Sequence, residues 1–114
     1  MRRDEAYLLD MLLFARDAQI AVRELTQEEF KRSRVHQLAA IKALETIGEA
    51  AGKISESFRS AHPEIPWGLI VGMRNRLVHA YFAVDLDEVW RVIQDDIPSL
   101  IGLLDPLVPP EEDD

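Results

Sequence analysis

Apolar residues recur along this chain every three or four positions, and no stretch alternates polar and apolar residues over the length of a strand. Four longer stretches show this spacing, and the first covers residues 4–24, with Leu9, Leu13 and Ile20 on one face. A spacing of three to four residues matches the 3.6-residue turn of an α-helix. The pattern therefore predicts an all-α chain.

The second helical stretch begins at Thr26-x-x-Glu29, a capping-box pattern, is expected to break near Ser33, and resumes to residue 58. Its apolar residues follow alternating steps of four and three, as in a coiled-coil seam: Ala40, Leu44, Ile47, Ala51, Ile54 and Phe58. Gly48 and Gly52 lie beside this seam, and each costs about 1 kcal/mol of helix propensity relative to alanine. We interpret both glycines as positions where another helix packs closely.

Prolines and acidic caps divide the rest of the chain. Residues 59–65 are predicted to form a loop, and a helix over residues 66–80 starts at Pro66, a residue suited to a first helical turn. Asp85-x-x-Glu88 begins the last helix, which Pro98 should kink or split. The pattern predicts an antiparallel bundle of four to five helices in one domain, residues 1–108, followed by an acidic tail, residues 109–114.

Residues 74–81 carry the candidate chemistry, because Arg74, Asn75, His79 and Tyr81 fall within about two helical turns. At about 100° per residue, Arg74 lies in the middle of an apolar stripe of its helix. An unpaired buried charge costs several kcal/mol, so Arg74 needs a partner, an interface or a ligand. An arginine can hold a phosphate, and a histidine can move a proton near neutral pH.

Composition narrows the class of protein. Of 114 residues, 47% are apolar and 30% are charged, a balance typical of soluble globular chains, and there is no cysteine. We expect no signal peptide or membrane span and a cytoplasmic location. The net charge of −8 lies entirely in residues 86–114, where nine acidic residues and one basic residue give −8. The neutral remainder leaves a nucleic-acid partner open.

Further residues match a known family: Ile65-Pro66-Trp67, Gly72-Met73-Arg74-Asn75, His79-Ala80-Tyr81, Val84-Asp85 and Ile47-Gly48-Glu49-Ala50-Ala51. They resemble the HepT-like family of small HEPN-domain ribonuclease toxins of bacteria and archaea. This resemblance implies a HEPN-type helical bundle that forms a homodimer, with the motifs facing a shared cleft. It also implies metal-independent cleavage of RNA, without a cofactor. The implied partner is a minimal nucleotidyltransferase antitoxin, which can transfer AMP to the tyrosine matching Tyr81.

Each candidate residue then has an expected role. His79 acts as general base or acid for attack of a ribose 2′-hydroxyl, and Arg74 stabilises charge on the phosphoryl oxygens. Asn75 orients His79 or donates to a phosphate. Glu49 is a candidate ion-pair partner for Arg74, and Arg76 is a candidate supporting residue.

Two other functions stay open at this stage. The bundle could be a non-catalytic subunit that helps a nucleotidyltransferase hold a nucleotide or substrate, or a purely structural dimer. The basic run Lys31, Arg32 and Arg34 is predicted to be a solvated face, with a loose RNA-backbone contact as the alternative. Four residues have structural expectations: His36 and His62 serve as surface or cap residues without metal-ligand spacing, and Trp67 and Trp90 lie in the core.

Overall fold

The computed structural model describes residues 2–79 and 83–110, except for the side chains of Arg2 and His79. Its elements in chain order are α1 (Arg2–Val22), α2 (Gln27–Lys31), α3 (Arg34–Lys53), α4 (Glu56–Ala61), α5 (Trp67–His79), α6 (Leu86–Arg91), the π-helix η1 (Val92–Asp96), α7 (Ile97–Leu104) and the 3₁₀ turn η2 (Asp105–Leu107). Within these ranges all regular structure is helical, which confirms the all-α prediction.

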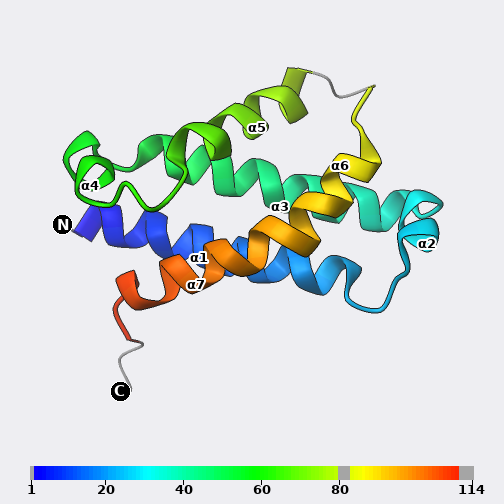
Figure 1. Cartoon of the computed structure of the whole chain (residues 1–114), viewed down its shortest axis with the longest axis horizontal. Helices are drawn as coiled ribbons and strands as arrows, with labels where there is room; N and C mark the ends of the chain where they lie inside the picture. The colour runs from blue at the N-terminus through cyan, green and yellow to red at the C-terminus, as the bar shows by residue number, and fades with distance from the viewer. Residues whose placement is uncertain (1, 80–82, 111–114) are drawn as a thin grey trace.

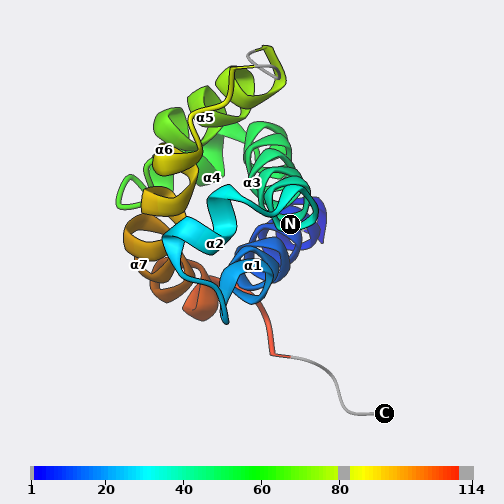
Figure 2. The ribbon, with the colours of Figure 1, turned by 90° about the vertical axis from the view of Figure 1, so that its right-hand side faces the viewer.

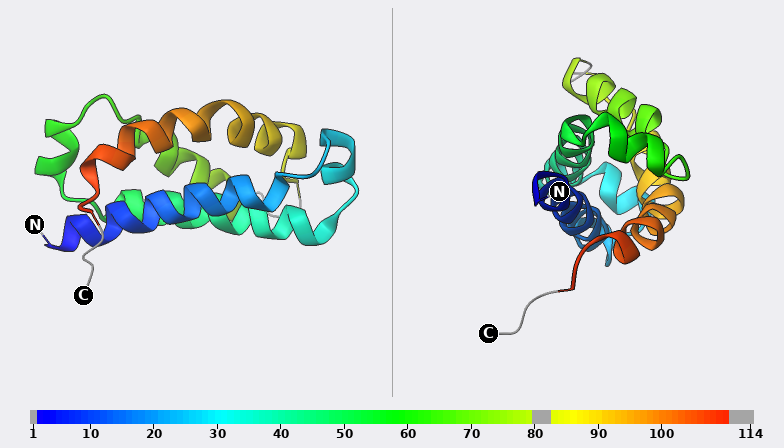
Figure 3. Two further views of the ribbon diagram at one scale, coloured as in Figure 1. Left: turned by 90° about the horizontal axis from the view of Figure 1, so that it is seen from below. Right: turned by 90° about the vertical axis from the view of Figure 1, so that its left-hand side faces the viewer.

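Two long helices form the base of the bundle. α1 and α3 run antiparallel along the long axis and pack against each other over most of their length (Figures 1 and 3). The rod made of α6, η1 and α7 packs on α1 through its α7 end. α5 packs mainly on α3 and lies at an outer corner, away from α1 (Figure 2). The helix with the candidate site is therefore supported chiefly by one neighbour.

The face of α1 that enters the core is not the one expected. Leu8, Met11 and Ala15 are at most 1% exposed, whereas Leu9 and Leu13 are 42% and 45% exposed. Adjacent residues differ by about 100° around a helix, so α3 covers the neighbouring stripe. Both stripes have helical spacing, and the sequence pattern cannot tell which of them α3 will cover.

The seam on α3 is confirmed, but the helix is shorter than predicted. Ala40, Leu44, Ile47, Ala51 and Ile54 are all at most 3% exposed. The helix ends at Lys53, and Ser55 caps a separate helix, α4, by accepting a hydrogen bond from the Phe58 amide. The helix is thus interrupted before Phe58. Helical structure then continues to Ala61, in a region that was predicted to be a loop.

The break at Ser55 is fixed by a residue far away in the sequence. Asp4 of α1 is 5% exposed and accepts hydrogen bonds from the Ser55 amide (2.8 Å) and the Ser55 hydroxyl (2.6 Å). The hydroxyl bond and then the amide bond lower the pKa of Asp4 below its ordinary value. Asp4 therefore ties the start of α1 to the junction of α3 and α4.

Replacing Asp4 with asparagine is expected to lower the free energy of unfolding at pH 7 by about 1–3 kcal/mol, because a buried charged acceptor is lost. The folded-state pKa of Asp4 is lowered, so its contribution is full above the ordinary value of about 3.9 and is lost as the pH falls through the folded value. Urea unfolding at pH 7 and at progressively lower pH measures this. Asp10→Asn, exposed on the same helix, is the control. Equal losses for the two variants at pH 7 would contradict the assignment.

The last rod is split as Pro98 predicts. The Asp85 side chain accepts from the amides of Asp87 and Glu88 and so starts α6. A π-helical turn over Val92–Asp96 then separates α6 from α7, and Pro98 occupies the first turn of α7. Pro98 has no amide hydrogen to donate, and the bonding changes from π-helical to α-helical next to it. In the described part of the chain, no helix has the length and apolar character needed to cross a membrane.

Candidate functional site

The helix that carries the motif is anchored at its first turn. Trp67 is 8% exposed, and its indole nitrogen donates to the His62 carbonyl oxygen at 3.0 Å. The Ile70 amide donates to the Pro66 carbonyl oxygen at 3.1 Å, so the helical bonding begins at Pro66. The described part of α5 extends to His79, and its predicted end, Ala80, lies outside the described residues. The start of α5 is held in the core, and its second half carries the motif.

Gly48 of α3 determines how closely α5 approaches. A Cβ atom added at Gly48 would lie 2.2 Å from the Cβ of Arg74 and 3.0 Å from the Ile70 carbonyl oxygen. No side chain fits there, so the two backbones are in close contact at Arg74. Gly52 differs, because its nearest atom, Val71 Cγ2, is 4.0 Å from an added Cβ. The prediction of close packing is right for Gly48 and wrong for Gly52.

The Arg74 side chain leaves this contact half-buried and without a carboxylate partner. Its Nη1 donates to Asn75 Oδ1 at 3.2 Å, and no carboxylate of the described residues pairs with it. Glu49, the expected ion-pair partner, is exposed and lies 3.8 Å from Lys53. The guanidinium is held by a neutral amide, so its charge remains available for an anion. The role predicted for Asn75, orienting His79, concerns a side chain outside the described structure.

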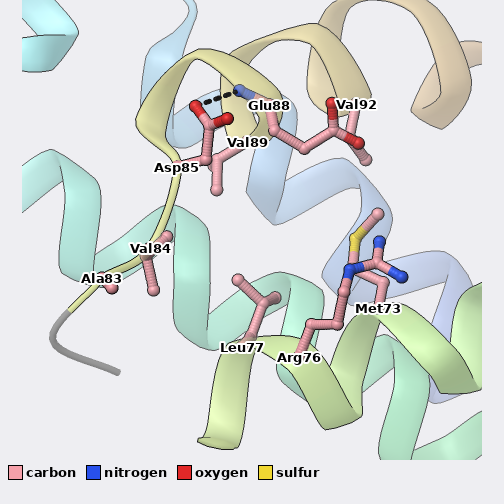
Figure 4. A pocket seen from close by; sticks show the side chains of 9 residues that line it. All are labelled: Met73, Arg76, Leu77, Ala83, Val84, Asp85, Glu88, Val89 and Val92. Carbon is pink, nitrogen blue, oxygen red and sulfur yellow. Dashed lines mark hydrogen bonds between the residues drawn. The ribbon is translucent and has the colours of Figure 1, made fainter. Parts of the chain in front are cut away.

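A small cavity of about 160 Å³ lies beside the motif, between α5 and α6 (Figure 4). Arg76 extends toward it from α5, and Glu88 from the opposite wall. Both Glu88 oxygens accept from Arg91, and this pairing is the main cause that lowers the Glu88 pKa; Arg76 adds to it through charge. The floor of the cavity is apolar, because the buried side chains of Leu77 and Val89 line it. The sequence singled out Arg76 but not this cavity.

Two of the candidate groups fall outside what the structure describes. His79 is the last residue of α5, but its side chain is not described, and Tyr81 lies in the gap at residues 80–82. The other two histidines have local roles, as expected. His36 Nδ1 bonds the Ser33 hydroxyl at the start of α3, and His62 ends α4 and contacts Glu64 at 3.0 Å. Among the described residues, no three histidine, aspartate or glutamate side chains gather as a metal site would require.

Comparison of the sequence with known proteins identifies the family of this chain. A family model described as "Ribonuclease HepT-like" matches residues 11–107. The chain is 46% identical over 85 residues, 75% of this chain and 77% of the relative, to "Probable ribonuclease HepT" of Thermococcus cleftensis. It is 37% identical over 100 residues, 87% of this chain and 92% of the relative, to "Putative RNase MJ1380" of Methanocaldococcus jannaschii. No solved structure gives a significant match. The matched span includes α5 and the α3 segment that supports it, and the chain belongs to the HepT-like ribonuclease family.

Proposed function

We propose that this protein is a metal-independent endoribonuclease, the toxin of a toxin–antitoxin pair of the type VII kind, and that residues 74–81 form its active site. The observation that carries the proposal is the packing and charge environment of the Arg74 side chain. Gly48 brings the arginine against α3, Asn75 holds its guanidinium, and no described carboxylate neutralises it. A half-buried, unneutralised guanidinium is well suited to hold a phosphodiester. The chain belongs to the HepT-like ribonuclease family, which supports RNA as the substrate.

In the proposed reaction, His79 takes the proton from a ribose 2′-hydroxyl, and the 2′-oxygen attacks the adjacent phosphorus. The bond from phosphorus to the 5′-oxygen breaks, and that oxygen takes a proton from a second acid. Arg74 stabilises the negative charge that builds on the non-bridging oxygens, with Asn75 fixing its fork of donors. The products are a 2′,3′-cyclic phosphate and a free 5′-hydroxyl.

The second acid is the reason for a homodimer in this proposal, because one motif supplies a single histidine. The fold offers an apolar groove of about 360 Å³ beside the motif helix. Ile70 and Met73 of α5 line one side, Ile97 and Leu100 the other, and Leu69 at its edge is 74% exposed. Exposed apolar patches of this kind mark interfaces between proteins. Sedimentation at micromolar concentration should give twice the mass of one chain.

Tyr81 has a separate role, as the acceptor of AMP from a nucleotidyltransferase antitoxin. The added group would bring bulk and negative charge next to Arg74, where the substrate phosphate must bind. The chain should therefore gain the mass of one AMP group when it is produced with its cognate nucleotidyltransferase, and should lose RNA cleavage. An unmodified chain that is still silenced would count against this role.

The test of the whole proposal is RNA cleavage by the purified protein in excess EDTA. We expect cleavage to continue in the chelator and to leave cyclic phosphate ends, which mass spectrometry of the fragments detects. If the dimer binds RNA without cutting it, the chain is a binding subunit and the enzymatic proposal is wrong.

A further inference from the structure

A cleft of about 470 Å³ lies between the first half of α3 and the segment that leads into α6. Arg34, Lys42 and Glu45 line it from α3, and Leu77 and Val84 close it from the other side. Leu77 and Val84 also line the cavity of Figure 4, so the two hollows share a wall at the last turn of α5. This cleft therefore opens next to the end of the motif helix.

Two cations in the cleft are not neutralised. Arg34 and Lys42 form no ion pair with any residue that the structure describes, and both are exposed. By contrast, Lys31 lies 3.1 Å from Asp87 and Lys53 lies 3.8 Å from Glu49. Two cations and one carboxylate, Glu45, give the cleft a net charge of +1, in a chain whose net charge is −8.

These cations lie on α3, toward its N-terminus from the point where Arg74 of α5 meets that helix. Gly48 marks where Arg74 meets α3. Lys42 lies six residues before it, about 9 Å along the axis, and Arg34 lies eight residues before Lys42, about 12 Å further. Two cationic side chains of α3 are thus spread along that helix, beyond the point where Arg74 of α5 meets it. An extended polyanion bound at Arg74 would meet the other two in turn.

We propose that this cleft binds the phosphate backbone of single-stranded RNA next to the phosphate that Arg74 holds. The inference rests on the proposed ribonuclease function and names a further binding site for its substrate. Arg34 and Lys42 contact phosphates and fix the register of the strand without reading its bases. Glu45, between them and Arg74, opposes the bound strand and limits its affinity.

The structure also revises which basic residues matter. Of the run Lys31, Arg32 and Arg34, Lys31 is paired with Asp87, and only Arg34 lines the cleft. Arg34 remains and is joined by Lys42, which stands outside the run. Helical geometry brings the two cations to one cleft although seven residues separate them in the sequence.

The test is RNA binding by the full chain carrying His79→Ala, which removes the proposed base and prevents cleavage during the measurement. The double substitution Arg34→Gln with Lys42→Gln is expected to weaken binding of a labelled single-stranded RNA about tenfold or more. It should also reduce the slope of log K against log salt by about 1.4, which is about 0.7 for each lost phosphate contact. Glu45→Gln should have the opposite effect and tighten binding.

The matched control is Arg3→Gln with Arg23→Gln, which removes the same charge from exposed positions on α1 and in the turn that follows it. It should leave the salt slope unchanged, and thermal unfolding should show all variants folded. Equal effects of the two double substitutions, or no change in slope for the cleft variant, would overturn the proposal. The proposal would also be overturned if the cleft variant bound RNA as tightly as the parent but bound a protein partner more weakly.

The two proposals fail in different ways. If the parent cleaves RNA in EDTA and the cleft variant keeps its affinity and salt slope, only the cleft assignment is wrong. If the chain binds RNA through Arg34 and Lys42 but never cleaves it, the cleft assignment stands and the ribonuclease proposal is wrong. If the parent binds no RNA, both are wrong.

Discussion

Arg74→Gln is expected to slow RNA cleavage by about 10²–10³-fold while the protein stays folded, because the variant removes a charged donor that acts in the transition state. Glutamine keeps much of the side-chain stem that packs beside Gly48, so lost activity cannot be attributed to lost packing. His79→Ala should cost about 10²–10⁴-fold, the usual contribution of a general acid or base. Single-turnover cleavage in EDTA measures both.

Arg23→Gln serves as the control for charge, since Arg23 is exposed in the turn after α1 and lies outside the proposed site. Arg74→Lys adds a second comparison, because lysine keeps the charge but cannot present a planar fork to phosphate, so it should restore activity only in part. If Arg74→Gln or His79→Ala cleaves RNA as fast as the parent, the assignment of the active site is wrong.

Gly48→Ala is expected to destabilise the protein by about 1–3 kcal/mol, although alanine is the better helix former. The new methyl carbon would lie 2.2 Å from the Arg74 Cβ, which is fixed to a helix backbone and cannot turn away. α5 must move outward to accept it, and the guanidinium moves with it. Misplacement of a catalytic group by about 1 Å costs on the order of 100-fold in rate, so activity should fall together with stability.

Gly52→Ala is the matched control, one turn along the same helix. Its added carbon would meet only Val71, at 4.0 Å, an ordinary contact. Helix propensity then dominates, and the free energy of unfolding should rise by up to about 1 kcal/mol with activity unchanged. Urea unfolding and single-turnover cleavage separate the pair. A stabilised Gly48→Ala would show that the helices are not in forced contact there.

The comparison of Gly48 with Gly52 shows where sequence reasoning stops. Both glycines border the same seam, and both carry the same cost in helix propensity. Only the packing of α5 on α3 separates them, because an added carbon would meet Arg74 at 2.2 Å at Gly48 but only Val71, at 4.0 Å, at Gly52. The same limit applies to Glu49, whose spacing allowed a pair with Arg74 and whose carboxylate lies beside Lys53 instead. A residue's partner across helices depends on an angle and a rotation that neither segment encodes alone.

Local signals, by contrast, were reliable. Thr26 and Glu29 form the capping box that their spacing predicts, and Asp85 caps α6 as its position predicts. Pro98 falls where the last rod changes from π-helix to α-helix. Each of these features depends on residues within a turn or two, so a short sequence window contains all the interacting groups.

The sequence by itself determined the helical class, most helix starts, the buried seam of α3 and the family to which residues 74–81 point. Only the tertiary structure decided which stripe of α1 is buried, where the helix is interrupted near Ser55, and which cations have no ion-pair partner among the described residues. Asp4 and Ser55 are 51 residues apart, and Lys31 and Asp87 are 56 apart. Such contacts form only when distant segments pack together. They are favourable because the partner groups are then buried and paired, and those partners lie outside any short stretch of sequence.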